Sequence, residues 1–333
     1  MRFLLRRLGF FVLTLWAALT LNFFIPRMMP GSPAEVLKAK LNHSGRVASP
    51  AQLDALLAAF GFDPHQGLIS QYFTYLKDMA TFHWGVSIGG SSLGASVTTM
   101  IAQALPWTLG LVGVATVMAF VVGTLIGIVA GWKRGGLLDG IVPPVFVVTS
   151  ALPYFWVALV SIVLFANGAH ALLPNDGNYD LGLHADWSWT FIGSVLKHAV
   201  LPGGTILITA IGGWILTMRN TMITTLAEDY VRMARAKGLS NRRIMMGYAA
   251  RNALLPNLSG FAMSLGYVIG GTILVEYVFN YPGLGHMFYL ATAGTDYPLL
   301  QALFMLVTVA VLICVLLCDF AIFLLDPRAR AKG

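Results

Sequence analysis

Long apolar runs alternate with shorter polar segments along the whole 333-residue chain. Six of the runs are long enough to cross a hydrocarbon core of about 30 Å as α-helices that rise about 1.5 Å per residue. They cover residues 8–25, 107–129, 141–165, 201–218, 258–279 and 300–325. Within the third run, Pro143, Pro144 and Pro153 predict breaks, because proline removes a backbone donor and clashes with the preceding turn. The pattern predicts an all-α polytopic membrane protein with six transmembrane helices.

The longest segment between two apolar runs, residues 29–100, is too long for an unstructured loop. Ser49 and Pro50 have the residue types of a helix cap and a first helical position. Residues 67–82 place apolar side chains at helical spacing. We therefore expect four parts, with a small helical extracytoplasmic domain between spans one and two. They are a first transmembrane helix (1–28), that domain (29–100), a transmembrane core (101–326) and a tail (327–333).

Composition supports the membrane interpretation, because 57% of the residues are hydrophobic and 11% are charged, against about 25% charged in soluble domains. The formal net charge of +7 is not a sign of nucleic-acid binding, since the Lys and Arg residues lie beside apolar runs. With six spans, 15 of the 21 Lys and Arg residues fall on the side that holds both termini. Positive loops mark the cytosolic side, so both termini are expected to face the cytosol.

The most basic polar segment between two apolar runs covers residues 228–256 and is placed in the cytosol by this topology. It predicts two helices, residues 229–237 and 241–253. Gly238 can end the first helix and Ser240 can cap the second. The segment is either an anchor that faces phospholipid or a docking surface for a protein, and its composition alone leaves both open.

The phosphate-binding loop and the common metal-binding or redox motifs are absent from the sequence. It holds no G-x-x-x-x-G-K-[ST], H-E-x-x-H or C-x-x-C. The seven His residues show no metal-ligand spacing, and Cys314 and Cys318 lie one helical turn apart in an apolar run, where a disulfide is not expected. We therefore expect no catalytic residue, no metal site and no cofactor bound by this chain, and we do not expect it to hydrolyse ATP itself. The scarcity of acids within the spans also argues against a stand-alone proton-coupled carrier.

The fifth apolar run is the most polar of the six and supplies the candidate pore residues. A pore or gate lining is expected from Ser264, Tyr267, Gly271, Thr272 and Glu276. For Glu276, a structural hydrogen-bonding role is favoured over contact with a substrate. Glycines at four-residue spacing, such as Gly123 and Gly127, are interpreted as sites of close helix contact.

Several motifs then carry a resemblance to a known family. The run ARAKGLS at residues 234–240, before the penultimate span, resembles the EAA loop of binding-protein-dependent ABC importer permeases. The longer pattern, EDYVRMARAKGLS followed by RRI and ARNALLPN, is similar to the B-type subunit of dipeptide, oligopeptide and nickel importers. LPWTL, VEYVF, PGLG and the terminal DPR agree with it in order. The sequence departs from the EAA pattern at Arg232, where the pattern has Glu, and at residues 248–251, which lack its Pro.

The resemblance implies a type I ABC importer permease fold in the bacterial cytoplasmic (inner) membrane. Its implied partners are a second homologous permease of C type, two ATP-binding subunits or one fused ATPase, an extracytoplasmic substrate-binding protein and membrane lipid. The implied ATPase-coupling loop consists of Ala234, Arg235, Ala236, Lys237, Gly238, Leu239, Ser240, Arg242, Arg243 and Ile244. Di- and oligopeptides are the expected substrates, with oligosaccharides or nickel chelates as alternatives. A stand-alone carrier or channel and a membrane-embedded enzyme are the competing classes.

Overall fold

The computed structural model describes residues 2–28, 33–43, 49–59, 62, 66–89, 92–166, 172–268, 270 and 272–325. Apart from one isolated bridge between Val86 and Ser96, the regular structure in these ranges is helical. The elements are α1 (Arg2–Met28), α2 (Pro33–His43), α3 (Pro50–Ala59), α4 (Leu68–Ala80), α5 (Val97–Thr108), η1 (Leu109–Gly113), α6 (Val114–Trp132), α7 (Leu137–Ala151), α8 (Tyr154–Phe165), α9 (Trp189–Leu226), α10 (Asp229–Ala236), α11 (Asn241–Arg243), η2 (Ile244–Ala250), α12 (Arg251–Val268), α13 (Ile273–Val278), α14 (Leu284–Ala293) and α15 (Tyr297–Leu325). The expected all-α architecture is confirmed for the described ranges.

Four helical stretches in the described ranges are long and apolar enough to cross a membrane, and α7 with α8 makes a fifth if this bent pair is one span. The four are residues 7–25 of α1, the continuous helix from α5 through α6, α9, and residues 297–318 of α15. The fifth expected span is not one continuous helix, because α12 ends at Val268 and α13 begins only at Ile273. Glycine is a poor helix former, and Gly266 and Gly270 lie beside this break.

The third expected span bends at only one of its three prolines. α7 continues through Pro143 and Pro144, so the breaks expected there are wrong. The chain turns by 98° between α7 and α8, where Leu152 is extended (φ −77°, ψ 133°) directly before Pro153. The Pro153 ring disfavours helical geometry at the preceding residue, which explains the position of the bend.

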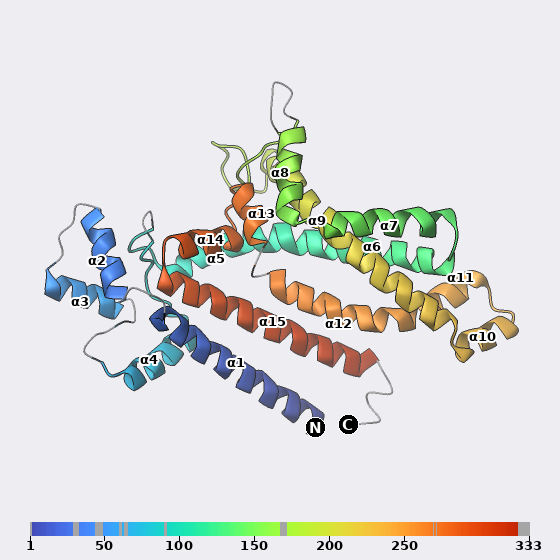
Figure 1. Cartoon of the computed structure of the whole chain (residues 1–333), viewed down its shortest axis with the longest axis horizontal. Coiled ribbons are helices and arrows are strands. Elements are labelled where there is room, and N and C mark those ends of the chain that lie inside the picture. Colours follow the sequence, from blue (N-terminus) through green and yellow to red (C-terminus); the bar gives the residue numbers. More distant parts are fainter. Residues whose placement is uncertain are drawn as a thin grey trace.

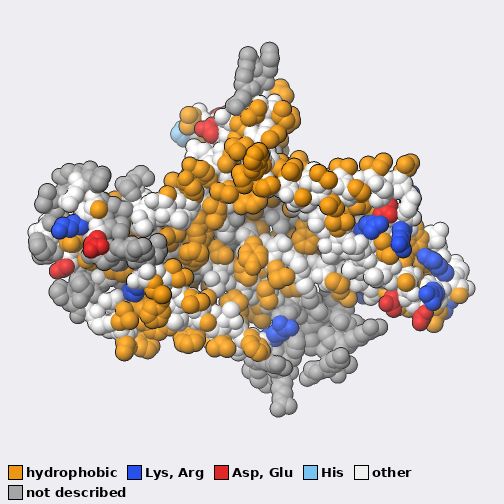
Figure 2. Space-filling view, viewed as in Figure 1, with side chains coloured by type: hydrophobic (Ala, Val, Ile, Leu, Met, Phe, Trp, Pro, Cys, Tyr) orange, Lys and Arg blue, Asp and Glu red, His pale blue; other side chains and the backbone are white. Residues whose placement is uncertain are grey.

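The molecule is elongated, with α2, α3 and α4 gathered at one end and α10 and α11 at the opposite end (Figure 1). Helices α1, α6, α9, α12 and α15 run along the region between the two ends. Hydrophobic side chains cover the middle of the face shown in Figure 2, whereas Lys and Arg are concentrated over the end that carries α10 and α11. The apolar band and the basic end agree with the pattern along the sequence.

The end of the molecule that carries α2, α3 and α4 shares part of its core with the region between the two ends. Tyr75 and Met79 of α4 are buried with Phe23 of α1 and Leu284 of α14.

α3 begins where the sequence predicts it, because the Ser49 hydroxyl accepts a hydrogen bond from the Gln52 amide at 3.3 Å. The Gln52 side chain accepts one from the Ser49 amide at 3.0 Å, so the two residues form a reciprocal cap.

Candidate functional site

A cavity of about 560 Å³ lies where α6, the α7–α8 bend, α9 and α12 meet. Its lining combines apolar side chains with hydroxyl groups and contains no charged side chain. The lining residues are Val112, Thr116, Ser150, Ala151, Leu152, Pro153, Tyr154, Ile206, Thr209, Ala210, Trp214, Ser264, Tyr267, Val268 and Thr272. A neutral cavity of this kind can hold a hydrated polar solute without selecting its charge.

The cavity exists because α7 crosses close to α9 and then turns away. At the crossing, a Cβ atom on Gly212 would collide with the Phe146 carbonyl oxygen and the Ser150 hydroxyl. Only glycine allows this approach. Beyond the crossing, the bend before Pro153 directs α8 away from α7 by 98°, which leaves space between the bend and α12.

The hydroxyl groups of the lining have defined hydrogen-bonding roles. Ser150, Thr209 and Ser264 each donate to a carbonyl one turn earlier in their own helix, at 2.7, 2.8 and 3.0 Å. A hydroxyl used in this way keeps its oxygen as an acceptor. Thr272 differs, because its hydroxyl oxygen is buried and has no hydrogen-bond partner among the described residues. The Thr272 hydroxyl is therefore a buried donor and acceptor at the wall of the cavity that has no partner among the described residues.

Three of the five candidate pore residues, Ser264, Tyr267 and Thr272, line this one cavity. Gly271 lies outside the described residues. Glu276 is not part of the lining, because its side chain is completely buried at a different place.

The Glu276 carboxylate connects α13, α14 and α5. One oxygen accepts a hydrogen bond from the Thr108 hydroxyl at 3.0 Å. The other accepts from the backbone amides of Gly285 at 2.8 Å and His286 at 3.2 Å, in the first turn of α14. A carboxylate at a helix N-terminus satisfies free amides and complements the helix dipole. In this structure Glu276 therefore holds helices together, and a contact with substrate remains a prediction.

The expected two-helix geometry of residues 228–256 is present at the opposite end of the molecule. α10 ends at Ala236, and Gly238 adopts φ +71°, the left-handed conformation that favours glycine. Ser240 occupies the cap position of the next helix, but its side chain accepts no capping hydrogen bond. That helix does not end near residue 253; it continues through η2 and α12 to Val268. The loop is therefore directly joined to an element that lines the cavity.

Buried side chains of the loop pack against the C-terminal ends of α6 and α9. Val231, Ala234 and Ile244 are buried in one cluster, against which Trp132 of α6 and Leu226 of α9 pack. Leu239 is half-buried beside them. The remaining candidate coupling residues are exposed: Arg235, Ala236, Lys237, Gly238, Ser240, Arg242 and Arg243. The loop thus presents a basic outer surface on an apolar inner surface, with the Arg235 guanidinium 5.9 Å from the centre of the Trp132 ring.

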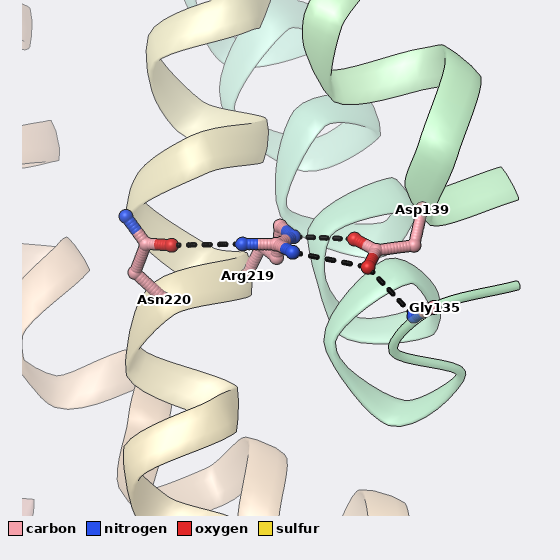
Figure 3. Close-up of polar contacts among 4 residues, drawn as sticks. All are labelled: Gly135, Asp139, Arg219 and Asn220. Atoms are coloured by element: carbon pink, nitrogen blue, oxygen red, sulfur yellow. Dashed lines mark hydrogen bonds and ion pairs between the residues drawn. The ribbon is translucent and has the colours of Figure 1, made fainter.

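An ion pair near this loop was missed by sequence reasoning. Asp139, in the first turn of α7, is buried and binds the Arg219 guanidinium of α9 through both carboxylate oxygens, one of them at 3.0 Å (Figure 3). Asp139 also accepts from the Gly135 amide at 2.9 Å, and Arg219 donates to Asn220 at 3.2 Å. In the sequence, only the positions of these two residues could have indicated the pair, because Asp139 and Arg219 each lie at the end of an apolar run. Their pairing across 80 positions depends on the fold.

Metal-binding residues do not cluster in the part of the chain that the structure describes, where no three His, Cys, Asp or Glu side chains form a candidate site. Cys314 and Cys318 are half-buried thiols, and Cys318 donates a hydrogen bond to the Leu258 carbonyl oxygen at 3.6 Å. The described arrangement thus offers hydrogen bonding, a neutral cavity and a basic surface.

Comparison with known proteins places this arrangement in a family. The model of the binding-protein-dependent transport system inner membrane component matches residues 123–331, from the middle of α6 onward. The chain is 31% identical over 329 residues to the dipeptide transport system permease protein DppB of Lactococcus lactis, covering 99% of each chain. It is 32% identical over 351 residues to the di/tripeptide transport system permease protein DppB of Pseudomonas aeruginosa, covering 98% of each. It is 31% identical over 330 residues to DppB of Bacillus subtilis, covering 99% of this chain and 98% of that one.

The family model covers more than half of the chain, and the relatives align with it over nearly the whole length of both chains. The apolar helices agree with a multi-pass protein of the bacterial inner membrane. The chain belongs to the family of inner-membrane components of binding-protein-dependent transport systems.

Proposed function

We propose that this chain forms half of the translocation pore of an ATP-driven importer of di- and oligopeptides. The observation that carries the substrate class is the full-length similarity to relatives whose names specify dipeptides or di/tripeptides. The neutral, hydroxyl-bearing cavity supports it, because a peptide carries a positive and a negative end and would be slowed by fixed charges of either sign. Selectivity among peptides would then belong mainly to the extracytoplasmic binding protein.

The coupling surface in this proposal is the basic outer side of the loop around Gly238. Its buried side, Val231, Ala234 and Ile244, fixes it to α6 and α9, and its second helix continues into α12. Movement of a docked ATPase would therefore reach the cavity through a rigid element, as in other transitions driven by rigid-body motion. The exposed Arg and Lys residues would set the register of docking through charge complementarity with an acidic groove.

The proposed topology has six spans with both termini in the cytosol, α12 and α13 together forming the fifth span and α7 and α8 the third. It places α2, α3 and α4 outside the membrane and α10 and α11 in the cytosol. The opposite positions of these two groups in the molecule support that assignment. The partners are a second permease, two ATP-binding subunits or one fused ATPase, and a binding protein, with ATP and Mg²⁺ on the ATPase.

The experiment is ATP-driven uptake of a labelled dipeptide by proteoliposomes that contain this chain with its partner subunits. We expect Gly238→Trp to abolish uptake and co-purification of the ATPase, while Gly193→Trp, on an exposed part of α9, leaves both intact. If Gly238→Trp retained docking and uptake, the coupling role would be wrong. If an oligosaccharide or a nickel chelate drove ATP hydrolysis and the dipeptide did not, the substrate class would be wrong.

A further inference from the structure

A second cavity of about 560 Å³ shares no lining residue with the first and lies between the outer part of α9 and the helix formed by α5, η1 and α6. It is an open apolar groove, since Val114 and Leu196 on its walls are more than half exposed. Nothing in the proposed translocation mechanism uses it. It lies on the surface of helices that the proposed topology places in the membrane.

Three glycines make the hollow. Gly110 lies on one wall, and Gly203 and Gly204 lie on the other. A Cβ atom added to Gly110 or Gly204 would meet no atom within 4 Å, and one added to Gly203 would meet only Leu111, at 3.5 Å. These glycines are therefore not required for close helix contact. Gly110 also lies in the π-helical turn Leu109–Gly113, an irregularity that is frequent at functional sites.

Aromatic rings close the outer end of the groove. Trp107 and Tyr281 are lining residues, with their ring centres 6.3 Å apart, and Tyr179 lies 5.8 Å from Trp107. Trp and Tyr are enriched at the level of lipid headgroups. Lys197 is exposed on α9, directly after Leu196 of the groove wall. A cation at this level attracts the phosphate of a lipid headgroup.

The dimensions of the groove distinguish a lipid chain from a protein helix. It follows α9 from Val195 to Leu207, which is about 18 Å at 1.5 Å per residue and close to half of a ~30 Å hydrocarbon core. A volume of 560 Å³ over that length averages about 31 Å² in cross-section, whereas a helix of about 10 Å diameter needs about 80 Å². The groove admits a narrow, flexible chain over the depth of one leaflet.

We propose that this groove holds one acyl chain of an outer-leaflet phospholipid whose phosphate pairs with Lys197. A lipid chain gains little hydrophobic free energy on moving from bilayer to protein. Retention therefore depends on dispersion contacts with the two walls and on the headgroup contact. Both contributions are local, and each is removed by a single substitution.

The test is native mass spectrometry of the chain purified from the membrane with its co-purifying subunits, after exchange into vesicles of phosphatidylethanolamine and phosphatidylglycerol. Gly110→Leu and Gly204→Leu each fill the groove from an opposite wall. We expect each variant to carry one bound phospholipid fewer per complex. The matched control is Gly193→Leu, because Gly193 is also on α9 and a Cβ atom there meets nothing within 4 Å, but it is not a lining residue.

The headgroup contact is tested in the same complex with Lys197→Gln, which we expect to lower occupancy of the bound phospholipid several-fold, while Lys197→Arg restores it. An unchanged lipid count in both Leu variants would overturn the proposal. So would an equal loss in Gly193→Leu. If the Leu variants instead released the second permease subunit and kept the lipid, the occupant would be a protein helix, and the lipid assignment would be wrong.

Discussion

The continuous helix α5–η1–α6 packs along α9, and the two halves of this contact use glycine in opposite ways. In the half nearer the basic loop, a Cβ atom on Gly123, Gly127 or Gly131 would lie 2.6–2.7 Å from atoms of α9. In the outer half, a Cβ atom on Gly110 or Gly204 would meet nothing within 4 Å. The expected close helix contact is therefore confirmed for the first group, while the second group leaves an open groove between the same two elements.

The difference shows that glycine in a membrane helix is ambiguous until its neighbours are known. In the closed half, the absence of a side chain lets two backbones approach, which is the main source of helix association where no hydrophobic effect acts. In the open half, it leaves a hollow that a separate molecule can fill. The closed half is also the part that connects the loop around Gly238 to the neutral cavity.

The largest expected effect comes from Gly127→Leu in the closed half. Its Cβ would lie 2.7 Å from both the Ile215 carbonyl oxygen and the Met218 Cβ, so the helices must separate. Overpacking of this kind costs about 3 kcal/mol or more when backbone has to move. We expect loss of monodisperse protein in detergent, measured by size-exclusion chromatography. A well-folded Gly127→Leu protein would contradict the tight-contact interpretation.

A smaller effect is expected where the closed half is fixed to α7. Asp139→Asn removes the charge that pairs with Arg219, and breaking a buried pair on one side costs about 3 kcal/mol. The Arg219 side chain is 24% exposed, so water reduces this to about 2 kcal/mol. Thermal unfolding should show the loss. The double variant Asp139→Asn with Arg219→Gln should recover part of it, and strictly additive losses would argue against direct pairing.

Gly238 represents a third use of glycine, a left-handed backbone conformation with open space around it. A Cβ atom there meets nothing within 4 Å, but φ is +71°. Gly238→Val should therefore destabilise the loop by about 1–2 kcal/mol through backbone strain alone. Gly238→Asn, which tolerates the left-handed conformation better, should lose less. Thermal unfolding of the two purified variants measures the difference, and equal losses would mean that strain is not the cause.

Gly110→Leu in the open half should leave stability unchanged or raise it by up to about 1 kcal/mol, because leucine is the better helix former. Its comparison with Gly127→Leu by size-exclusion chromatography is the most direct check of the contrast between the two halves. A loss as large as that of Gly127→Leu would show that the groove closes in the folded protein.

The smallest effect is expected before the outer end of α9. Ser188 caps this helix by accepting from the Phe191 amide at 3.2 Å, and Asp186 accepts from the Ser188 amide at 3.0 Å. The side-chain and backbone hydrogen bonds from Ser188 lower the pKa of Asp186. Its small contribution is therefore present above the ordinary carboxyl pKa and is lost as pH falls through the lowered one. In Asp186→Asn this acid-dependent part of the melting curve should disappear; an unchanged curve would exclude the contribution.

Local pattern was enough for a large part of the molecule. The apolar runs predict helices, because only helices satisfy backbone groups within lipid, and the cap at Ser49 and the turn at Gly238 follow from residue type. The family resemblance of the loop also rests on contiguous residues. The membership it implied is confirmed by the family model, and the roles of the individual loop residues stay predictions.

Contacts between distant segments were decided by the tertiary structure. The sequence placed Ser264, Tyr267 and Thr272 on a polar stretch, but only the crossing of α7 over Gly212 and the turn at Pro153 make a cavity for them. Glu276 lies on the same polar stretch and was included among the candidate gate residues. In the structure its carboxylate oxygens instead accept hydrogen bonds from Thr108 and from the first turn of α14.

What the sequence by itself determined is the class of the chain, the approximate position of its helices and the excess of positive charge on one side, all of which depend on composition and local periodicity. Only the tertiary structure decided which glycines are in contact, that Asp139 binds Arg219, and that the fifth apolar run is divided at Val268. The physical reason is that these features arise from groups far apart in the chain, and their distances are set by packing rather than by local preference.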